Sequence, residues 1–108
     1  MKELLEKLKS LDPTTYERYI GSDLVSSDQP EYISAWILTE SAKMAWLQAC
    51  LQDAILTKGW HFQQMAREGR CMVDITVFEP ECDIIDGPER KTPAEAMLVA
   101  YIEACEAI

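Results

Sequence analysis

The chain has 108 residues, 48% of them hydrophobic, and ten Lys and Arg side chains against nineteen Asp and Glu give it a net charge of −9. This length is typical of one domain, and this apolar content is enough for a buried core and argues against general disorder. Phosphate backbones and anionic lipids repel so acidic a chain, so we expect no direct binding to nucleic acid or to a membrane surface.

The N-terminal sequence and the cysteine usage indicate a compartment. Residues 1–8 carry charges with no continuous apolar run after them, which predicts the absence of a signal peptide. No stretch approaches the roughly 20 apolar residues of a membrane span. We therefore expect a cytoplasmic protein. Its cysteines are then expected to be free, small core residues, namely Cys50, Cys71, Cys82 and Cys105.

The first part of the chain predicts two short helices followed by a loop. Residues 2–11 place leucines on one helical stripe, and Asp12 and Pro13 are a cap and a first-turn residue for a second helix. Residues 22–30 are polar and rich in turn formers, which predicts a loop, with a helical turn near residues 30–36. A plain connection is the simpler interpretation, although a binding loop would have the same composition.

Residues 39–58 predict a long helix that ends at Gly59, and this helix has two apolar stripes. One stripe consists of Met44, Leu47, Cys50, Leu51, Ala54 and Ile55. The other consists of Ala42, Ala45, Trp46, Ala49 and Leu56. A surface helix needs only one such stripe. The N-terminal helices, a second copy of the chain in a homodimer, or another protein must cover the Trp46 stripe, and burial within the chain is favoured.

The next stretch predicts a small antiparallel sheet. Residues 60–65 and 71–78 alternate between apolar and polar faces as strands do, and the Gly-containing segment at 67–70 predicts a hairpin between them. Residues 82–85 are a candidate third strand. A polar turn at 86–88 then leads into the last helix.

Residues 92–108 predict an amphipathic helix around which the sheet is organised. Thr92 is an N-cap, Pro93 fits the first helical position, and Glu95 completes a capping-box pattern. The expected buried arc consists of Ala94, Met97, Leu98, Tyr101, Ile102, Ala104, Cys105 and Ile108.

Apolar residues on both strand faces, and helices before and after the strands, predict an α+β fold. We expect a three-layer helix/sheet/helix sandwich with a small antiparallel sheet of two or three strands and a capped C-terminal helix. The expected single domain covers 1–108, with a helical N-terminal part and loop at 1–38 and an α-β-β-(β)-α core at 39–108.

Three short patterns carry a family resemblance. Ala45-Trp46 lies in the long helix, Gly59-Trp60 follows fourteen residues on, and Lys91-Thr-Pro-Ala-Glu-Ala96 opens the last helix after the strands. In this order the chain resembles the phage ABA-sandwich domain family, small proteins encoded by bacteriophages and prophages, over about residues 40–108. The resemblance implies the sandwich fold and a phage protein in the host-cell cytoplasm. It implies no catalytic residues.

The sequence offers little catalytic or metal-binding chemistry. His61 is the only histidine and so the only candidate histidine base, and none of the cysteines lies in an activating motif. A zinc site built from His61, Cys71 and Cys82 lacks the closely spaced ligand pairs typical of such sites. We therefore expect neither an enzyme nor a metal or cofactor site.

Two charged segments are candidate binding sites. Glu79, Glu81, Asp83, Asp86 and Glu89 form an acidic run that lacks EF-hand spacing but could face a divalent ion or a basic partner. A solvated charge run is the simpler interpretation. Arg90 and Lys91 precede a helix N-terminus, where a phosphate or nucleotide could bind, although there is no Gly-rich loop and Pro93 removes one donor.

These features favour a small phage-encoded, non-enzymatic binding protein. It could be a counter-defence inhibitor, such as an anti-CRISPR protein, that occupies a host protein surface which otherwise holds nucleic acid. The residues predicted to bind that partner are Trp46, Glu79, Glu81, Asp83 and Asp86. One alternative is a sponge that sequesters a small nucleotide signal at Arg90 and Lys91 in an oligomer. Another is a virion assembly protein.

Overall fold

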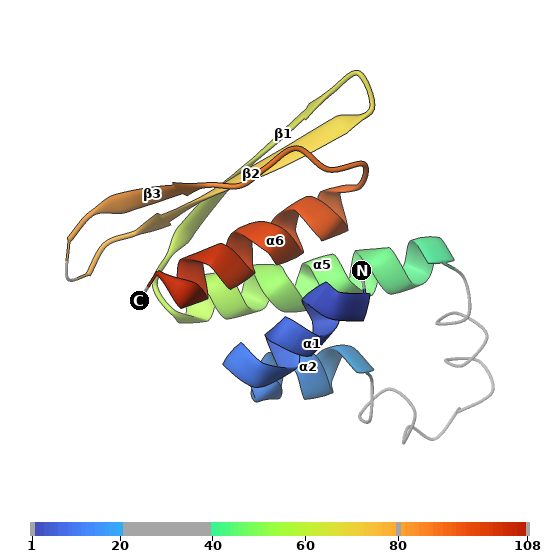
Figure 1. Ribbon diagram of the computed structural model, residues 1–108, viewed down its shortest axis with the longest axis horizontal. Coiled ribbons are helices and arrows are strands. Elements are labelled where there is room, and N and C mark those ends of the chain that lie inside the picture. Colours follow the sequence, from blue (N-terminus) through green and yellow to red (C-terminus); the bar gives the residue numbers. More distant parts are fainter. Residues whose placement is uncertain (1, 21–39, 80, 108) are drawn as a thin grey trace.

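The computed structural model describes residues 2–20, 40–79 and 81–107. The described helices are α1 (Lys2–Leu11), α2 (Pro13–Ile20), α5 (Glu40–Thr57) and α6 (Pro93–Glu106), and the strands are β1 (His61–Arg67), β2 (Arg70–Val77) and β3 (Asp83–Asp86) (Figure 1). The predicted helices and strands are therefore present, with boundaries within about two residues at the ends compared. The loop predicted at 22–30 and the turn predicted near 30–36 lie outside the described residues.

The described strands form one antiparallel sheet in the order β1-β2-β3. Arg67 pairs with Arg70 across the hairpin, and the two loop residues have positive φ angles, 52° at Glu68 and 75° at Gly69. Two positive φ angles are typical of a type I′ turn, whose twist matches that of the strands it joins. The candidate third strand is confirmed as β3, in which Asp83 pairs with Val77 and Asp86 with Asp74.

The core lies between β2 and the helices. Cys71, Val73, Ile75 and Val77 on one face of β2 are all buried, as the alternation predicts. Helix α6 packs against β2 on one side and against α5 and α1 on others. It is therefore buried over more of its surface than the predicted apolar arc, since Ala96, Val99 and Ala100 are buried as well. Surrounding elements, rather than the helix's own amphipathic pattern, set this burial.

The start of α6 confirms the predicted Thr92 N-cap and the proline at the first helical position. The Thr92 hydroxyl accepts a 3.2 Å hydrogen bond from the Glu95 backbone N–H, and Pro93 is the first helical residue. The Glu95 carboxylate lies 3.6 Å from Nη1 of Arg90. Upstream, Gly87 comes so close to β2 that an added Cβ would lie 2.6 Å from the Val73 carbonyl oxygen. Only glycine fits at this position without a shift of the backbone.

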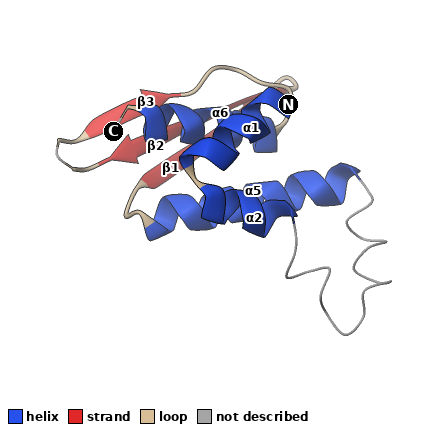
Figure 2. Ribbon diagram, turned by 60° about the horizontal axis from the view of Figure 1, so that its bottom comes forward, coloured by secondary structure: helices blue, strands red, loops and turns tan. Residues whose placement is uncertain are grey.

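Helix and sheet layers make up the expected mixed α+β fold. Figure 1 shows the sheet at the top, α6 and α5 below it, and α1 and α2 at the bottom, and Figure 2 gives a second view of the sheet and helices. A hydrophobic cluster joins buried residues of α1, α5, the sheet and α6. On the sheet face opposite Val73, the side chains of Met65 and Ile84 are exposed by 41% and 58%. Among the described helices, none is both long and apolar enough to cross a membrane.

Candidate functional site

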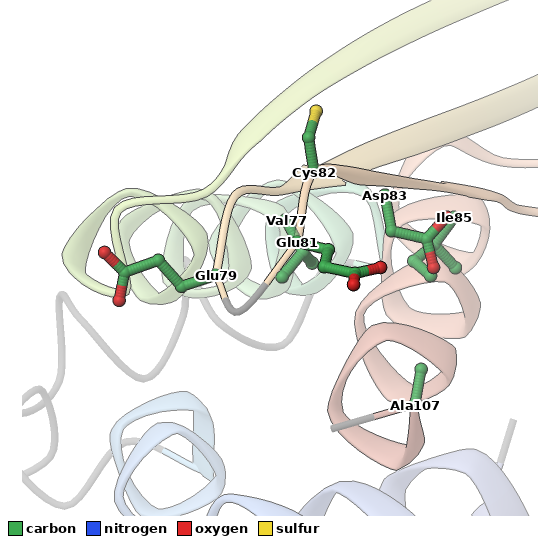
Figure 3. A pocket seen from close by; sticks show the side chains of 7 residues that line it. All are labelled: Val77, Glu79, Glu81, Cys82, Asp83, Ile85 and Ala107. Carbon is green, nitrogen blue, oxygen red and sulfur yellow. The ribbon is translucent and has the colours of Figure 1, made fainter.

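Three of the predicted acidic residues line one hollow at the end of the sheet. The hollow has a volume of about 440 Å³, and its walls combine carboxylates with apolar side chains (Figure 3). Its lining residues are Val77, Glu79, Glu81, Cys82, Asp83, Ile85 and Ala107. We call this the acidic hollow. It is the candidate functional site.

The strand register explains how residues of β2 and β3 come to line the same hollow. Asp83 pairs with Val77, and the period of two in a strand places Asp83 and Ile85 on the Val77 face of the sheet. Glu79 and Glu81 come from the loop between β2 and β3, and Figure 3 shows Cys82 pointing away from Glu81. In Figure 3 the Glu81 and Asp83 carboxylates lie on the side of the hollow nearer α6, whereas the Glu79 carboxylate points away from them.

The end of α6 adds to the negative potential of the acidic hollow. Ala107 follows the last helical residue, and its N–H donates to the Glu103 carbonyl at 3.0 Å. The carbonyl end of a helix carries a partial negative charge, which a basic side chain commonly offsets. The last turn of α6 has no basic residue, and it contains the exposed Glu103 and Glu106. This arrangement favours a positively charged partner.

The structure does not bring Asp86 to the acidic hollow, although the sequence prediction grouped them. Asp86 pairs with Asp74 on the opposite face of the sheet from Asp83. Burial raises the pKa of Asp74, and the neighbouring Asp86 carboxylate raises it further. The Oδ1 atom of Asp74 is enclosed and has no hydrogen-bond partner among the residues that the structure describes. Strand alternation across 83–86 was the sequence signal that could have separated Asp83 from Asp86.

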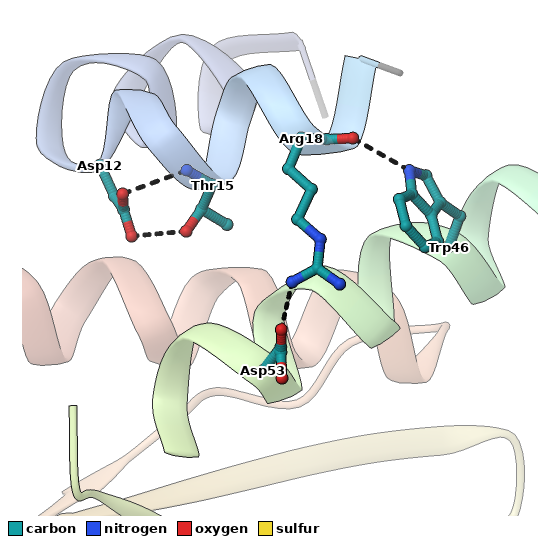
Figure 4. Close-up of polar contacts among 5 residues, drawn as sticks. All are labelled: Asp12, Thr15, Arg18, Trp46 and Asp53. Carbon is teal, nitrogen blue, oxygen red and sulfur yellow. Dashed lines mark hydrogen bonds and ion pairs between the residues drawn. The ribbon is translucent and has the colours of Figure 1, made fainter. Parts of the chain in front are cut away.

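The Trp46 side chain makes contacts within the chain, with helix α2. Its indole N–H donates to the backbone carbonyls of Arg18, at 3.2 Å, and Tyr19, at 3.1 Å, and Figure 4 shows the contact with Arg18. The Arg18 guanidinium lies 5.6 Å from the indole centroid and also pairs with Asp53. Helix α2 thus covers part of Trp46, which is half-buried, so the favoured interpretation, burial of the stripe within the chain, holds in part and for this residue. The stripe's Ala45, Ala49 and Leu56 remain exposed.

Arg90 and Lys91 line a separate hollow of about 530 Å³ near the start of α6. Arg70, Glu89 and Glu95 contribute to the same hollow. The Arg70 and Glu89 side chains lie 3.3 Å apart, and those of Arg90 and Glu95 lie 3.6 Å apart. An anion bound here would compete with both carboxylates, so the geometry favours this site less than the acidic hollow.

The structure separates the residues considered for zinc binding. His61 pairs with Thr76 on the outer face of the sheet, whereas Cys71 is buried on the inner face, and Cys82 is exposed. Within the described ranges, no cluster of three or more His, Cys, Asp or Glu side chains could hold a metal ion. Burial raises the pKa of Cys50 to about 11, which keeps it a thiol at neutral pH.

A polar cluster that the sequence did not predict joins the two ends of the chain. The Asp12 carboxylate accepts hydrogen bonds from the Thr15 N–H, the Thr15 hydroxyl and the Tyr101 hydroxyl. Burial acts to raise the pKa of Asp12, but these hydrogen bonds outweigh it and lower that pKa. Asp12 is recognisable in sequence as a cap. Its bond to Tyr101 spans 89 positions, and no local pattern indicates it.

Comparison with known proteins identified no relative of this chain. No protein-family model matches the chain, and no curated protein or solved structure is significantly similar to it. The resemblance to the phage ABA-sandwich family therefore stays a prediction based on the short patterns in the sequence.

Proposed function

We propose that the protein is a non-enzymatic binding protein that holds a basic surface of another protein in its acidic hollow. The observation that supports this proposal is that Glu79, Glu81 and Asp83 line one hollow whose walls are partly apolar. Carboxylates attract Lys and Arg side chains of a partner and orient the encounter. The apolar parts of the walls, Val77 and Ile85, can cover the aliphatic stems of those side chains.

A nucleic-acid-binding protein of the host is the partner class that we favour. Such proteins present clustered cations that normally contact phosphates, and a row of carboxylates can compete for the same cations. This is the counter-defence role expected for a phage protein, with an anti-CRISPR inhibitor as one form of it.

The two alternative functions have weaker support. A nucleotide sponge would use Arg90 and Lys91, where Glu89 and Glu95 already neutralise part of the positive charge. A virion assembly role calls for large homo-oligomers, which mutual repulsion opposes in a chain of net charge −9.

The proposal is tested by pull-down from bacterial proteins that a heparin column retains, because heparin selects proteins with basic surfaces. We expect the chain to capture partners at low salt and to release them as salt rises. Glu81→Lys combined with Asp83→Lys should abolish the capture by reversing two of the three charges.

The matched control is Asp86→Lys, which makes the same kind of charge change on the other face of the sheet. It should leave the capture intact. Capture that survives the double reversal, or that is lost equally with Asp86→Lys, would show that net charge and not the acidic hollow mediates binding.

A further inference from the structure

Within the described part of the chain, strand β1 is an open edge of the sheet, and its centre lacks the charges that usually protect such an edge. It pairs with β2 on one side, and in the described part of the chain no other strand pairs with it. Gln63, Gln64, Met65 and Ala66 in its centre are exposed and uncharged. Residues 54–67 contain no Asp or Glu, although the chain has nineteen of these residues. Uncharged edge strands are templates for pairing with another strand.

The backbone groups that β1 leaves unpaired can be identified from the bonds of β2. The N–H and C=O of Cys71 bond to Arg90 at 2.7 and 2.8 Å, and the Val73 C=O accepts from Gly87. These groups point away from β1. Ala66 and Gln64, which face Cys71 and Val73, therefore direct their own N–H and C=O groups to the open edge. The same alternation applies to Phe62, which faces Ile75.

We propose that a second copy of the chain pairs antiparallel with β1 about Gln64 and joins the two sheets into one. Gln64 then faces Gln64 of the other copy. Phe62 of each copy faces Ala66 of the other, which gives two further facing pairs. Each of these three facing pairs consists of residues whose outward backbone groups have no strand partner in the described ranges, so each pair can form two hydrogen bonds. No other two-fold register of β1 matches as many free groups.

Side chains on the inner face support this register. Phe62 is half-buried, and Ala66 lines a hollow of about 160 Å³ together with Gln48 and Pro93. In the proposed pairing, the Phe62 ring of one copy lies beside Ala66 of the other, at the edge of this hollow. The small Ala66 side chain leaves room for the ring, and covering it removes apolar surface from water.

The distribution of charge favours β1 rather than β3, the other edge strand, as the site of pairing between two copies. Self-pairing of the four-residue β3 would bring the Asp83 and Asp86 carboxylates of both copies into one short interface, which is repulsive. The interface at β1 brings together two acid-free strands and keeps the acidic hollow, on the β3 side, free for another partner. The proposal does not depend on the proposed function.

The test is the molar mass of the chain by size-exclusion chromatography with light scattering. We expect the unaltered chain to show twice its mass of 12.3 kDa. Gln64→Glu and Gln64→Lys should each halve the measured mass, because like charges then face each other at the two-fold axis. Mixing these two variants should restore the dimer, since the charges become opposite. Gln63→Glu and Gln63→Lys are the matched controls on the outer face, where residue 63 faces Met65, and both should remain dimeric.

Disulfide trapping tests the register itself. Facing residues at such a position have Cα atoms about 5.5 Å apart, within the range of a disulfide. In a Cys82→Ser background, Gln64→Cys should form a covalent dimer on mild oxidation, whereas Gln63→Cys should not. Monomeric unaltered protein at every concentration would overturn the proposal, as would a dimer that neither charge at residue 64 weakens. Glu81→Lys with Asp83→Lys should leave the dimer intact, so this proposal and the proposed function can fail separately.

Discussion

Asp12 ties the N-terminal helices to α6 through a single carboxylate. Burial and the nearby Asp12 carboxylate raise the pKa of Tyr101, so the hydroxyl stays protonated and can donate to Asp12. The same side chain caps α2 by accepting from Thr15. One residue therefore stabilises a helix start and a contact between distant parts of the chain.

We predict that Asp12→Asn lowers the free energy of unfolding by about 1–2 kcal/mol at neutral pH, because it removes the charge and the carboxylate oxygen that accepts from the Thr15 and Tyr101 hydroxyls. The folded-state pKa of Asp12 lies below the ordinary 3.8. Its carboxylate therefore stabilises the fold above that value, and this stabilisation is lost as pH falls through the folded-state pKa. Urea unfolding at neutral and acidic pH measures both effects. Glu17→Gln, at an exposed position of α2, is the control, and an equal loss in both variants would contradict the prediction.

Asp74 has the opposite effect on stability. Its folded-state pKa is raised by burial and by Asp86, so ionisation costs stability as pH rises through that pKa, and the cost is absent at lower pH. We predict that Asp74→Asn stabilises the protein at neutral pH by roughly 0.2–1 kcal/mol, the usual size of a cross-strand charge effect. Thermal unfolding measures the change. Asp86→Asn should give a similar gain, and a lower midpoint in either variant would contradict the explanation.

Helix α2 makes polar contacts with α5 near its C-terminal end. Trp46 binds the carbonyls of Arg18 and Tyr19, close to the C-terminus of α2, where backbone acceptors lack partners within the helix. The Arg18–Asp53 ion pair is largely exposed and contributes little by comparison. The indole N–H is therefore the contact to test.

We predict that Trp46→Phe destabilises the protein by about 1 kcal/mol, because the ring stays apolar but the N–H donor is lost. Hydrogen exchange should become faster in α2 and stay unchanged in β2. Asp53→Asn is the control that removes the exposed ion pair, and it should have a smaller effect. If Trp46→Phe changed the oligomeric state instead of exchange in α2, Trp46 would be an interface residue rather than a contact within the chain.

At the scale of the whole molecule, negative charge limits the stability of the compact state. With a net charge of −9, acidic groups repel one another, and dissolved salt screens this repulsion. We predict that moderate NaCl raises the midpoint of thermal unfolding. The rise should be smaller for Glu103→Gln combined with Glu106→Gln, which removes two exposed charges at the end of α6. A midpoint that fell with added salt would show that attractive ion pairs outweigh the repulsion.

Local patterns in the sequence predicted most elements of this fold. The Asp12-Pro13 start of α2, the Glu68-Gly69 turn and the Thr92-Pro93 start of α6 each depend on residues within one turn of chain. The prediction of the candidate site was less complete. Of the predicted acidic run, Glu79, Glu81 and Asp83 line one hollow, whereas Asp86 lies on the other face of the sheet and Glu89 lines the hollow of Arg90 and Lys91.

Sequence alone determined the α+β class, the hairpin, the helix caps and the excess of negative charge, because propensity, periodicity and composition are local or additive properties. Only the tertiary structure decided that α6 is buried on most sides, that Trp46 contacts α2, and that Tyr101 reaches Asp12. It also decided which carboxylates share the acidic hollow and which backbone groups β1 leaves free. These features depend on contacts between residues far apart in the chain, and such contacts are set by how the elements pack rather than by the pattern within any one of them.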